Sequence, residues 1–204
     1  MARERTTTTY AILGLLSVRR WTTYELTKQV QRSLNWFWPR AERKLYDEPK
    51  RLVDEGLATA SREYTGQRAR TVYQITRRGR SALRQWLDEP SRPRSSEFEA
   101  MVKVFFADAG SKDQLLATLD GIAQEAAARL DSLADMAATN PFPFPQRLHI
   151  SALGLQMQYE QERAMLRWAR WATRQVDEWP AADDPGAWDS RRVLAAIAKG
   201  TAHP

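Results

Sequence analysis

Two groups of basic side chains in the first half of the chain have the residue types and spacing of a nucleic-acid-binding surface. The first group is formed by Arg40, Arg43, Lys44 and Lys50. The second is the pair Arg68 and Arg70, which stands beside a Gly-containing turn. Guanidinium and ammonium groups neutralise backbone phosphates and can donate hydrogen bonds to base edges in the major groove. The sequence therefore predicts that both groups contact DNA.

The two groups differ in their alternative explanations. The first could be a solvated helix face, because the acidic residues Glu42, Asp47 and Glu48 are interspersed with it. The second has no packing reason to be basic, so contact with phosphates or the minor groove is the better prediction. Tyr24 and Tyr46 could reach the DNA backbone through their hydroxyls, and either could equally be a core tyrosine.

A helix is expected to carry the first basic group. Leu45, Leu52 and Val53 fall on one helical face, and Gly56 stands where a helix should end. Pro49 lies inside this pattern, where it cannot donate to the carbonyl four residues earlier. The helix therefore either kinks at Pro49 or begins later. We favour the kink, because the apolar residues keep their helical phase across it.

A hairpin and a further helix should follow. Residues 57–64 and 70–75 have the composition of two strands, and residues 65–67 form the turn between them. Thr76 is a good N-cap for a helix over residues 77–88. A basic helix followed by a basic two-stranded ribbon can place the helix in the major groove and the ribbon tip over the adjacent backbone.

Two helices are expected before the basic one. Residues 10–16 are nearly all apolar, and length alone does not separate a buried strand from a buried helix; the residues that follow favour a helix. Thr22 and Glu25 have the spacing of a capping box. Leu26, Val30 and Leu34 then recur every four residues. They form one apolar stripe of a helix that should end near Asn35. The order of elements predicts a winged helix-turn-helix.

The second half of the chain is predicted to be a separate, helical domain. Residues 89–96 are rich in Pro, Ser and Arg, so we divide the chain into a DNA-binding domain at residues 1–90, a linker at 91–97 and a dimerisation and effector domain at 98–204. The fold class is thus mainly α with a small β-wing.

Three apolar stripes indicate the helices of this domain. They are Phe98, Met101, Val102, Phe105, Phe106 and Ala109; Leu115, Leu119, Ile122, Ala126, Leu130, Leu133 and Ala137; and Leu148, Ala152, Leu155, Tyr159, Leu166 and Ala169. The first is expected to be core or dimer interface, and the second has coiled-coil-like spacing. The cluster Trp168, Trp171 and Trp179 is either interface packing or the lining of a pocket for a flat aromatic effector.

Charge and composition narrow the possible functions. Residues 1–90 hold 18 Lys/Arg against 10 Asp/Glu, whereas residues 91–204 hold 13 against 15, so the basic excess lies where the DNA-binding elements are predicted. The chain has no Cys, and His149 and His203 are too far apart for a metal site. We expect no metal, no cofactor and no catalysis. With no bilayer-spanning run and no signal peptide in residues 1–9, we expect a cytoplasmic protein.

The order of these motifs resembles the PadR family of bacterial transcriptional regulators. The resemblance rests on ILGLLS at residues 12–17, TYEL at 23–26, LY at 45–46 with LVDEGL at 52–57, YQIT at 73–76, and Gly79-Arg80. The stretch FEAMVKVFF, at residues 98–106, and the helices after it are similar to the extended dimerising domain of the longer family members. The chain departs from the family pattern at Thr23, where Gly is common, and at Asp47, where Pro usually follows the Tyr.

The resemblance and the basic surface together predict a homodimeric repressor on a pseudo-palindromic operator, modulated by a small aromatic effector. The alternative is a protein–protein adaptor that uses the winged fold as a docking surface without sequence-specific DNA binding. The excess of positive charge in residues 1–90 favours the repressor.

Overall fold

The computed structural model describes residues 5–34, 42–94, 97–139 and 144–201, without the side chains of residues 42–44, 65 and 68. The chain forms two compact units, Met1–Arg94 and Ser95–Pro204. Among the described residues, no helix is both long and apolar enough to span a membrane. The predicted fold class is confirmed, with helices throughout and one small sheet.

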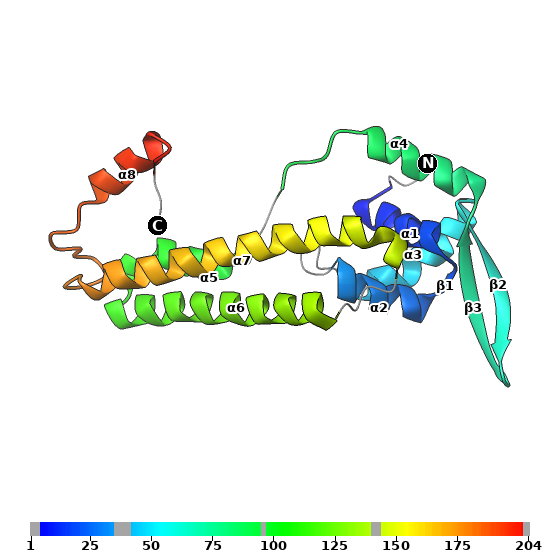
Figure 1. Ribbon diagram of the computed structural model, residues 1–204, viewed down its shortest axis with the longest axis horizontal. Helices are drawn as coiled ribbons and strands as arrows, with labels where there is room; N and C mark the ends of the chain where they lie inside the picture. Colours follow the sequence, from blue (N-terminus) through cyan, green and yellow to red (C-terminus); the bar gives the residue numbers. More distant parts are fainter. Residues whose placement is uncertain (1–4, 35–41, 95–96, 140–143, 202–204) are drawn as a thin grey trace. The chain divides into compact units, whose positions relative to one another are not determined.

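The N-terminal unit is a group of helices from which a long hairpin extends (Figure 1). Its elements are α1 (Thr7–Val18), β1 (Trp21–Thr22), α2 (Thr23–Ser33), α3 (Glu42–Asp54), β2 (Ala58–Thr65), β3 (Arg68–Ile75) and α4 (Arg77–Asp88). The apolar run at residues 10–16 is therefore helical, as favoured. Because α1 contacts α3, α4 and β3, most of its circumference is covered and its core residues Ile12, Leu13 and Leu16 are almost completely buried.

The predicted capping box at the start of α2 is confirmed. The Thr22 hydroxyl accepts a hydrogen bond from the Glu25 amide at 3.2 Å, and the Glu25 carboxylate accepts one from the Thr22 amide at 2.8 Å. Burial opposes the charged form of Glu25, but the hydrogen bonds from Thr22 and the nearby Arg19 guanidinium outweigh it. The pKa of Glu25 therefore lies below its usual value.

The sheet has a third strand that sequence patterns did not reveal. The two residues of β1 pair antiparallel with β3, so that the strand order is β1-β3-β2. Trp21, which interrupts the first apolar run, is buried in β1, and its indole N–H donates to the Leu15 carbonyl at 2.7 Å. Two residues are too few to show an alternating pattern.

The hairpin is longer than predicted, and its turn is tighter. Thr65 pairs with Arg68, so only Gly66 and Gln67 remain in the turn, whereas a three-residue turn was expected. Gly66 has φ of 61°, which is typical of two-residue hairpin turns and favours glycine. The predicted strand limits are therefore wrong by one or two residues next to the turn, which brings Arg68 into β3.

The third helix is continuous through its proline. α3 spans Glu42–Asp54 with Pro49 inside, so the alternative in which the helix begins after Pro49 is wrong. The kink stays a prediction. At its C-terminus, Gly56 adopts φ of 71°, while its amide donates to Val53 and that of Leu57 to Leu52. This is a glycine-capped helix end, as predicted.

The fourth helix packs directly on the base of the hairpin. Thr76 caps α4 as predicted, because its hydroxyl accepts from the Gly79 amide at 3.0 Å; it also donates to the Gly56 carbonyl at 2.9 Å. A Cβ on Gly79 would collide with the Leu57 carbonyl oxygen. Only glycine permits this close approach.

The C-terminal unit is helical. Its elements are α5 (Glu99–Phe105), the 3-10 turn η1 (Ala107–Ala109), α6 (Lys112–Thr139), the 3-10 turn η2 (Pro145–Arg147), α7 (Leu148–Asp177) and α8 (Ser190–Ala198). α6 and α7 run side by side (Figure 1). Two of these helices begin at side-chain caps: Ser111 and Gln114 bond reciprocally before α6, and the Asp189 carboxylate accepts from the Arg192 amide at the start of α8.

The predicted apolar stripes of this unit are buried to different extents. The α6 stripe is largely buried, at Leu115, Leu119, Ile122, Ala126 and Leu133. Of the α7 stripe only Ala169 is buried, because α7 packs mainly against a single neighbour, α6. In α5 and just after it, Val102, Phe105 and Phe106 are 55%, 79% and 61% exposed, so the core interpretation is wrong for these three and the dimer interpretation stays open.

Replacing Glu25 with Gln should reduce the acid sensitivity of the fold. Since the pKa of folded Glu25 is lowered, its ionised form stabilises the protein above the unfolded-state pKa, roughly 4.3, and this contribution is lost as pH falls through the folded pKa. Urea unfolding followed by circular dichroism should show the variant to be less stable at neutral pH, and the difference from the parent should shrink as pH falls below the unfolded-state pKa. Glu89→Gln, at an exposed residue, is the control; a gap that persists at low pH would contradict the assignment.

Candidate nucleic-acid interface and a tryptophan-lined cavity

α3 presents one face to the core and the other to solvent. Leu45, Glu48, Pro49 and Leu52 are buried, whereas Tyr46, Asp47, Lys50 and Asp54 are exposed. Arg51 fixes this orientation against α1. Its Nη2 lies 2.5 Å from the Thr9 hydroxyl and 2.7 Å from Glu48 Oε1, and its Nε lies 3.4 Å from a Glu55 carboxylate oxygen. The outer face of α3 is thereby held outward.

Two of the predicted DNA-contacting residues lie on this outer face. Tyr46 is 41% exposed and Lys50 is also exposed, so the core alternative for Tyr46 is wrong. Arg43 and Lys44 belong to α3, but their side chains lie outside the described part of the structure, as does Arg40 entirely. The exposed Asp47 is an additional group on this face, and its carboxylate repels phosphates.

The first turns of α2 add an aromatic and a basic group. Tyr24 is 62% exposed, which also excludes the core alternative for this tyrosine. One turn later the Lys28 ammonium lies 5.8 Å from the centroid of the Tyr24 ring. Lys28 was not among the predicted residues. The i, i+4 spacing from Tyr24 was the signal that could have identified it.

The wing carries a carboxylate that competes for its arginines. Arg70 is half exposed, and its guanidinium lies 3.6 Å from a carboxylate oxygen of Glu63, the residue opposite it in the hairpin. The other oxygen of Glu63 accepts from Arg20 at 2.8 Å. The side chain of Arg68 is outside the described part. Arg70 is therefore available to phosphate only in competition with Glu63.

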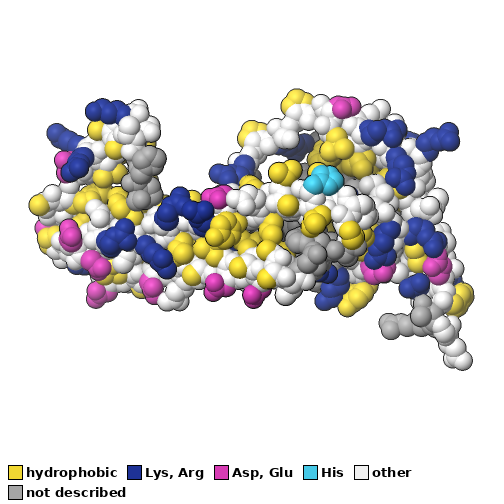
Figure 2. Space-filling view, viewed as in Figure 1, with side chains coloured by type: hydrophobic (Ala, Val, Ile, Leu, Met, Phe, Trp, Pro, Cys, Tyr) yellow, Lys and Arg dark blue, Asp and Glu magenta, His cyan; other side chains and the backbone are white. Residues whose placement is uncertain are grey.

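Further basic and aromatic residues on this unit escaped the sequence prediction. Arg62 and Tyr64 are exposed on β2, with the guanidinium 5.8 Å from the ring centroid. Their alternation along the strand was the available signal. The exposed arginines of α4 are Arg77, Arg78, Arg80 and Arg84. Lys and Arg side chains gather over α4 and the base of the hairpin in Figure 2. The basic surface is thus broader than the two groups predicted.

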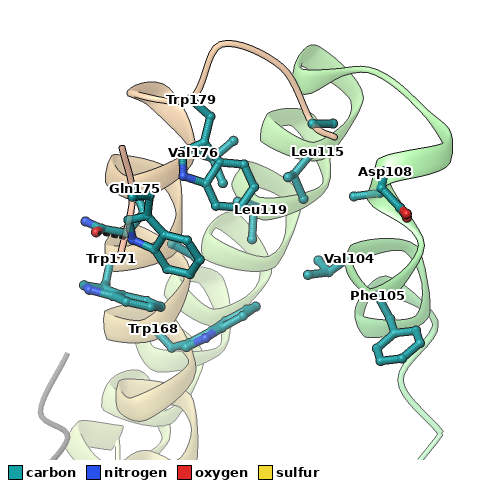
Figure 3. Close-up of a pocket in the computed structure, with 14 residues that line it drawn as sticks. Val104, Phe105, Asp108, Leu115, Leu119, Trp168, Trp171, Gln175, Val176 and Trp179 are labelled. Carbon is teal, nitrogen blue, oxygen red and sulfur yellow. Dashed lines mark hydrogen bonds between the residues drawn. The ribbon is translucent and has the colours of Figure 1, made fainter. Parts of the chain in front are cut away.

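The C-terminal unit contains a cavity of about 360 Å³. Its lining side chains come from α5, η1, α6, α7 and the segment after α7. The three tryptophans predicted as a cluster, Trp168, Trp171 and Trp179, all line it, together with Trp188, which was not predicted. In Figure 3 the rings of Trp168 and Trp179 project toward Val104 and Leu119, and Asp108 lies on the α5 side. The cluster is therefore gathered around an open space.

The segment after α7 is held against the cavity by specific contacts. The Lys112 ammonium donates to the carbonyls of Asp177 and Trp179 at 2.7 and 2.8 Å. The Trp188 indole N–H donates to Gln175 Oε1 at 3.0 Å, and the rings of Trp179 and Trp188 are 5.2 Å apart. The Trp179 indole N–H is buried, and no described residue accepts a hydrogen bond from it. One wall of the cavity thus depends on residues 179–188.

The geometry of the N-terminal unit defines a class of protein. A capped helix, a helix with an exposed polar face, a two-stranded wing and a surface rich in arginine together make a winged helix-turn-helix of the DNA-binding type.

Comparison with known proteins identifies the domain in each unit. Residues 12–85 match the transcriptional regulator PadR-like family, and residues 98–177 match the C-terminal domain called virulence activator alpha. The chain thus joins a PadR-like regulator domain to that C-terminal domain, which confirms the resemblance read from the motifs. This is a family of transcriptional regulators and not of enzymes. Residues 178–204, which include Trp179 and Trp188, lie beyond both matches.

Individual relatives agree with this assignment. The chain is 27% identical over 177 residues to the negative transcriptional regulator PadR of Bacillus subtilis, covering 83% of this chain and 97% of that protein. Two crystal structures of B. subtilis PadR are similar to this chain. In each, the sequence identity is 26% and the match includes the whole PadR chain. The complex with operator DNA covers 84% of this chain with a TM-score of 0.76, and the complex with p-coumaric acid covers 85% with a TM-score of 0.70.

Replacing Lys112 with Met should loosen the outer wall of the cavity. The variant loses both hydrogen bonds to the carbonyls at the end of α7, while its aliphatic stem still fills the same space. Hydrogen–deuterium exchange should become faster in residues 179–188 and stay unchanged in the middle of α6. Lys103→Met removes an exposed ammonium from α5 and serves as the control. Unchanged exchange in residues 179–188 would show that Lys112 does not hold this segment.

Proposed function

We propose that the protein is a homodimeric transcriptional repressor that binds a pseudo-palindromic operator. The observation that carries the proposal is the exposed face of α3, bearing Tyr46 and Lys50, beside a wing rich in arginine in a PadR-like domain. The relative from B. subtilis is a negative regulator and was crystallised with operator DNA. In this proposal, residues 1–90 bind the operator, 91–97 link, and 98–204 dimerise and bind an effector.

The proposed DNA contacts combine the predicted residues with those that the structure adds. α3 enters the major groove, while α2 and the wing contact the flanking backbone. The predicted contacts are Tyr24, Arg40, Arg43, Lys44, Tyr46, Lys50, Arg68 and Arg70, and the added ones are Lys28, Arg62 and Tyr64. In this scheme Asp47 lowers the affinity for unrelated DNA, because its carboxylate repels any phosphate that approaches the outer face of α3. A carboxylate in the major groove can also accept a hydrogen bond from cytosine.

A second copy of the chain is the proposed cover for the apolar surface of the C-terminal unit. Val102, Phe105 and Phe106 are exposed near α5, and the first half of α7 exposes Leu148, Ile150, Leu153 and Met157. Hydrophobic side chains are frequent along α7 in Figure 2. Exposed apolar side chains that gather on a surface in this way mark an interface. A twofold dimer presents two reading heads, which explains a palindromic operator.

We further propose that the cavity at Trp168, Trp171 and Trp179 binds a small aromatic effector that releases the operator. Its volume is within the range of small-molecule sites, and five of the fourteen residues that line it are aromatic. The relative crystallised with p-coumaric acid shows that a protein of this fold takes an aromatic ligand. The protein needs no metal or cofactor and catalyses no reaction in this scheme. Because its target is chromosomal DNA, it acts in the cytoplasm.

A gel-shift experiment on the DNA beside its own gene tests the main proposal. The full-length protein should retard this DNA in the presence of excess unrelated DNA. If each dimer neutralises six to ten phosphates, affinity should fall by about 10³–10⁵-fold between 50 and 200 mM salt. Absence of binding at low salt would instead support the alternative, a protein–protein adaptor built on the same fold.

Changing Arg68 and Arg70 together to Ala should weaken binding to every DNA sequence. The slope of log affinity against log salt should decrease by about 0.9 for each phosphate that is no longer neutralised, or about 2 to 4 for a dimer. Arg167→Ala with Arg170→Ala removes the same charge from the exposed side of α7 and is the control. An unaltered slope in the wing variant would overturn the assignment of the wing to the DNA backbone.

Replacing Glu63 with Gln should strengthen binding to unrelated DNA. The change removes the carboxylate that pairs with Arg20 and Arg70 and frees both guanidinium groups for phosphates. Affinity at low salt should increase on the order of threefold to tenfold, with a steeper salt dependence. Asp88→Asn, at the exposed end of α4, is the matched control. Weaker binding by the Glu63 variant would mean that the carboxylate positions the arginines and does not compete for them.

A further inference from the structure

We propose that the natural ligand of the C-terminal cavity is an organic cation, an aromatic or alkyl ammonium compound, and not a carboxylate. This inference rests on the proposed role of the cavity as an effector site and specifies the chemical class of its ligand. It concerns a wall that the family matches do not include, because Trp179 and Trp188 lie beyond residue 177, where the second match ends.

The aromatic lining is suited to a cation. Four indoles surround the space, those of Trp168, Trp171, Trp179 and Trp188, and Phe105 adds a fifth ring. The face of an aromatic ring is negative, and among aromatic side chains tryptophan attracts an ammonium group most strongly. Several such rings around one space form the kind of cage that recognises alkylated ammonium groups.

The charged residues at the cavity also favour a cationic ligand. Asp108 is the only ionisable residue among the described residues that line it, and no lysine or arginine is among them. The nearby Lys112 ammonium is engaged by the carbonyls of Asp177 and Trp179 and is not part of the lining. The arginines of this part of α7, Arg170 and Arg174, are exposed and do not line it either.

The segment that forms the outer wall is itself acidic. Between residues 177 and 189 the chain has five carboxylates and no Lys or Arg. These residues are Asp177, Glu178, Asp183, Asp184 and Asp189, and all are exposed. The segment holds its shape through an Asp184 carboxylate oxygen that accepts from the Gly186 amide at 2.9 Å. Its negative potential raises the local concentration of cations and repels anions.

A carboxylate would be poorly accommodated in the same space. Moving an ionised carboxylate out of water is costly unless a cation or several donors replace its hydration. The Trp188 indole N–H is already bonded to Gln175, and the neutral N–H of Trp179 is no counter-ion. A neutral donor of this kind suits a hydroxyl group on the ligand. The p-coumaric acid bound by the B. subtilis relative is an anion near neutral pH, so the two proteins should differ in effector class.

Three probes of similar size test the inference on the full-length protein by isothermal titration calorimetry. They are para-hydroxyphenyl-trimethylammonium, its neutral carbon isostere para-tert-butylphenol, and p-coumarate. The first two have the same shape and differ in charge alone. The cation should bind at least tenfold more tightly than the isostere at low salt, and p-coumarate should bind most weakly. Equal binding of cation and isostere, tighter binding of p-coumarate, or binding of none of the three would overturn the proposal.

Two variants locate the site. Asp108→Asn should weaken cation binding by about threefold to tenfold and leave para-tert-butylphenol unchanged, since only the charge attraction is removed. Asp131→Asn makes the same change at an exposed position farther along α6 that does not line the cavity, and should alter neither. Equal weakening in the two variants, or none in either, would overturn the assignment to this cavity. Asp108 is exposed, and circular dichroism checks that its variant is folded.

The same proteins in the gel shift separate this inference from the proposed function. Cation binding without any DNA binding would overturn the repressor and keep the ligand class. If the protein binds DNA and p-coumarate, acting at the cavity, releases that DNA more effectively than the cation does, the proposed repressor function would stand. The proposed ligand class would then be overturned.

Discussion

The recognition surface depends on one short stretch of backbone, Gly56 and Leu57. The Leu57 amide donates to Leu52 at the end of α3 at 2.8 Å, and its carbonyl accepts from the Thr76 amide at 3.0 Å, where β3 ends and α4 begins. The Thr76 hydroxyl donates a hydrogen bond to the Gly56 carbonyl. Gly79 lies so close that a Cβ on it would collide with the Leu57 carbonyl oxygen. The ends of α3 and β3 and the starts of β2 and α4 therefore meet at one point, which fixes the wing relative to α3.

This constraint explains why the exposed polar groups can form one surface. The outer face of α3 and the base of the wing leave the same junction, while Arg51 secures α3 to α1 from the other side. Side chains on rigid elements lose less entropy on binding than side chains on loops. The wing is different, because Arg70 lies along a two-stranded ribbon and pairs with Glu63. In the proposed complex such a residue would adjust to the phosphate backbone, whereas those of α3 would have to meet particular base edges.

Much of this fold could be predicted because its signals are local. The capping box at Thr22, the glycine that ends α3 and the cap of α4 each depend on residues within one helical turn. The strand β1 could not be predicted, since two residues have no period and their pairing with β3 is a long-range contact. At the interface the exposure of Tyr24 and Tyr46 and the pairing of Arg70 with Glu63 were decided by tertiary packing. Trp168, Trp171 and Trp179 were grouped from sequence, but Trp188 joins them only because residues 179–188 fold back onto α7.

The two units of the chain differ in local charge, and this difference bears on which ligand each would attract. The chain as a whole is basic, yet residues 177–189, beside the cavity, include five carboxylates and no Lys or Arg. A uniformly basic protein would attract anions everywhere, including small anionic effectors at its DNA-binding surface. An acidic wall around an aromatic cavity instead attracts cations, which the basic unit repels. DNA and a cationic effector would then be drawn to different parts of the same chain, so neither competes directly for the other's site.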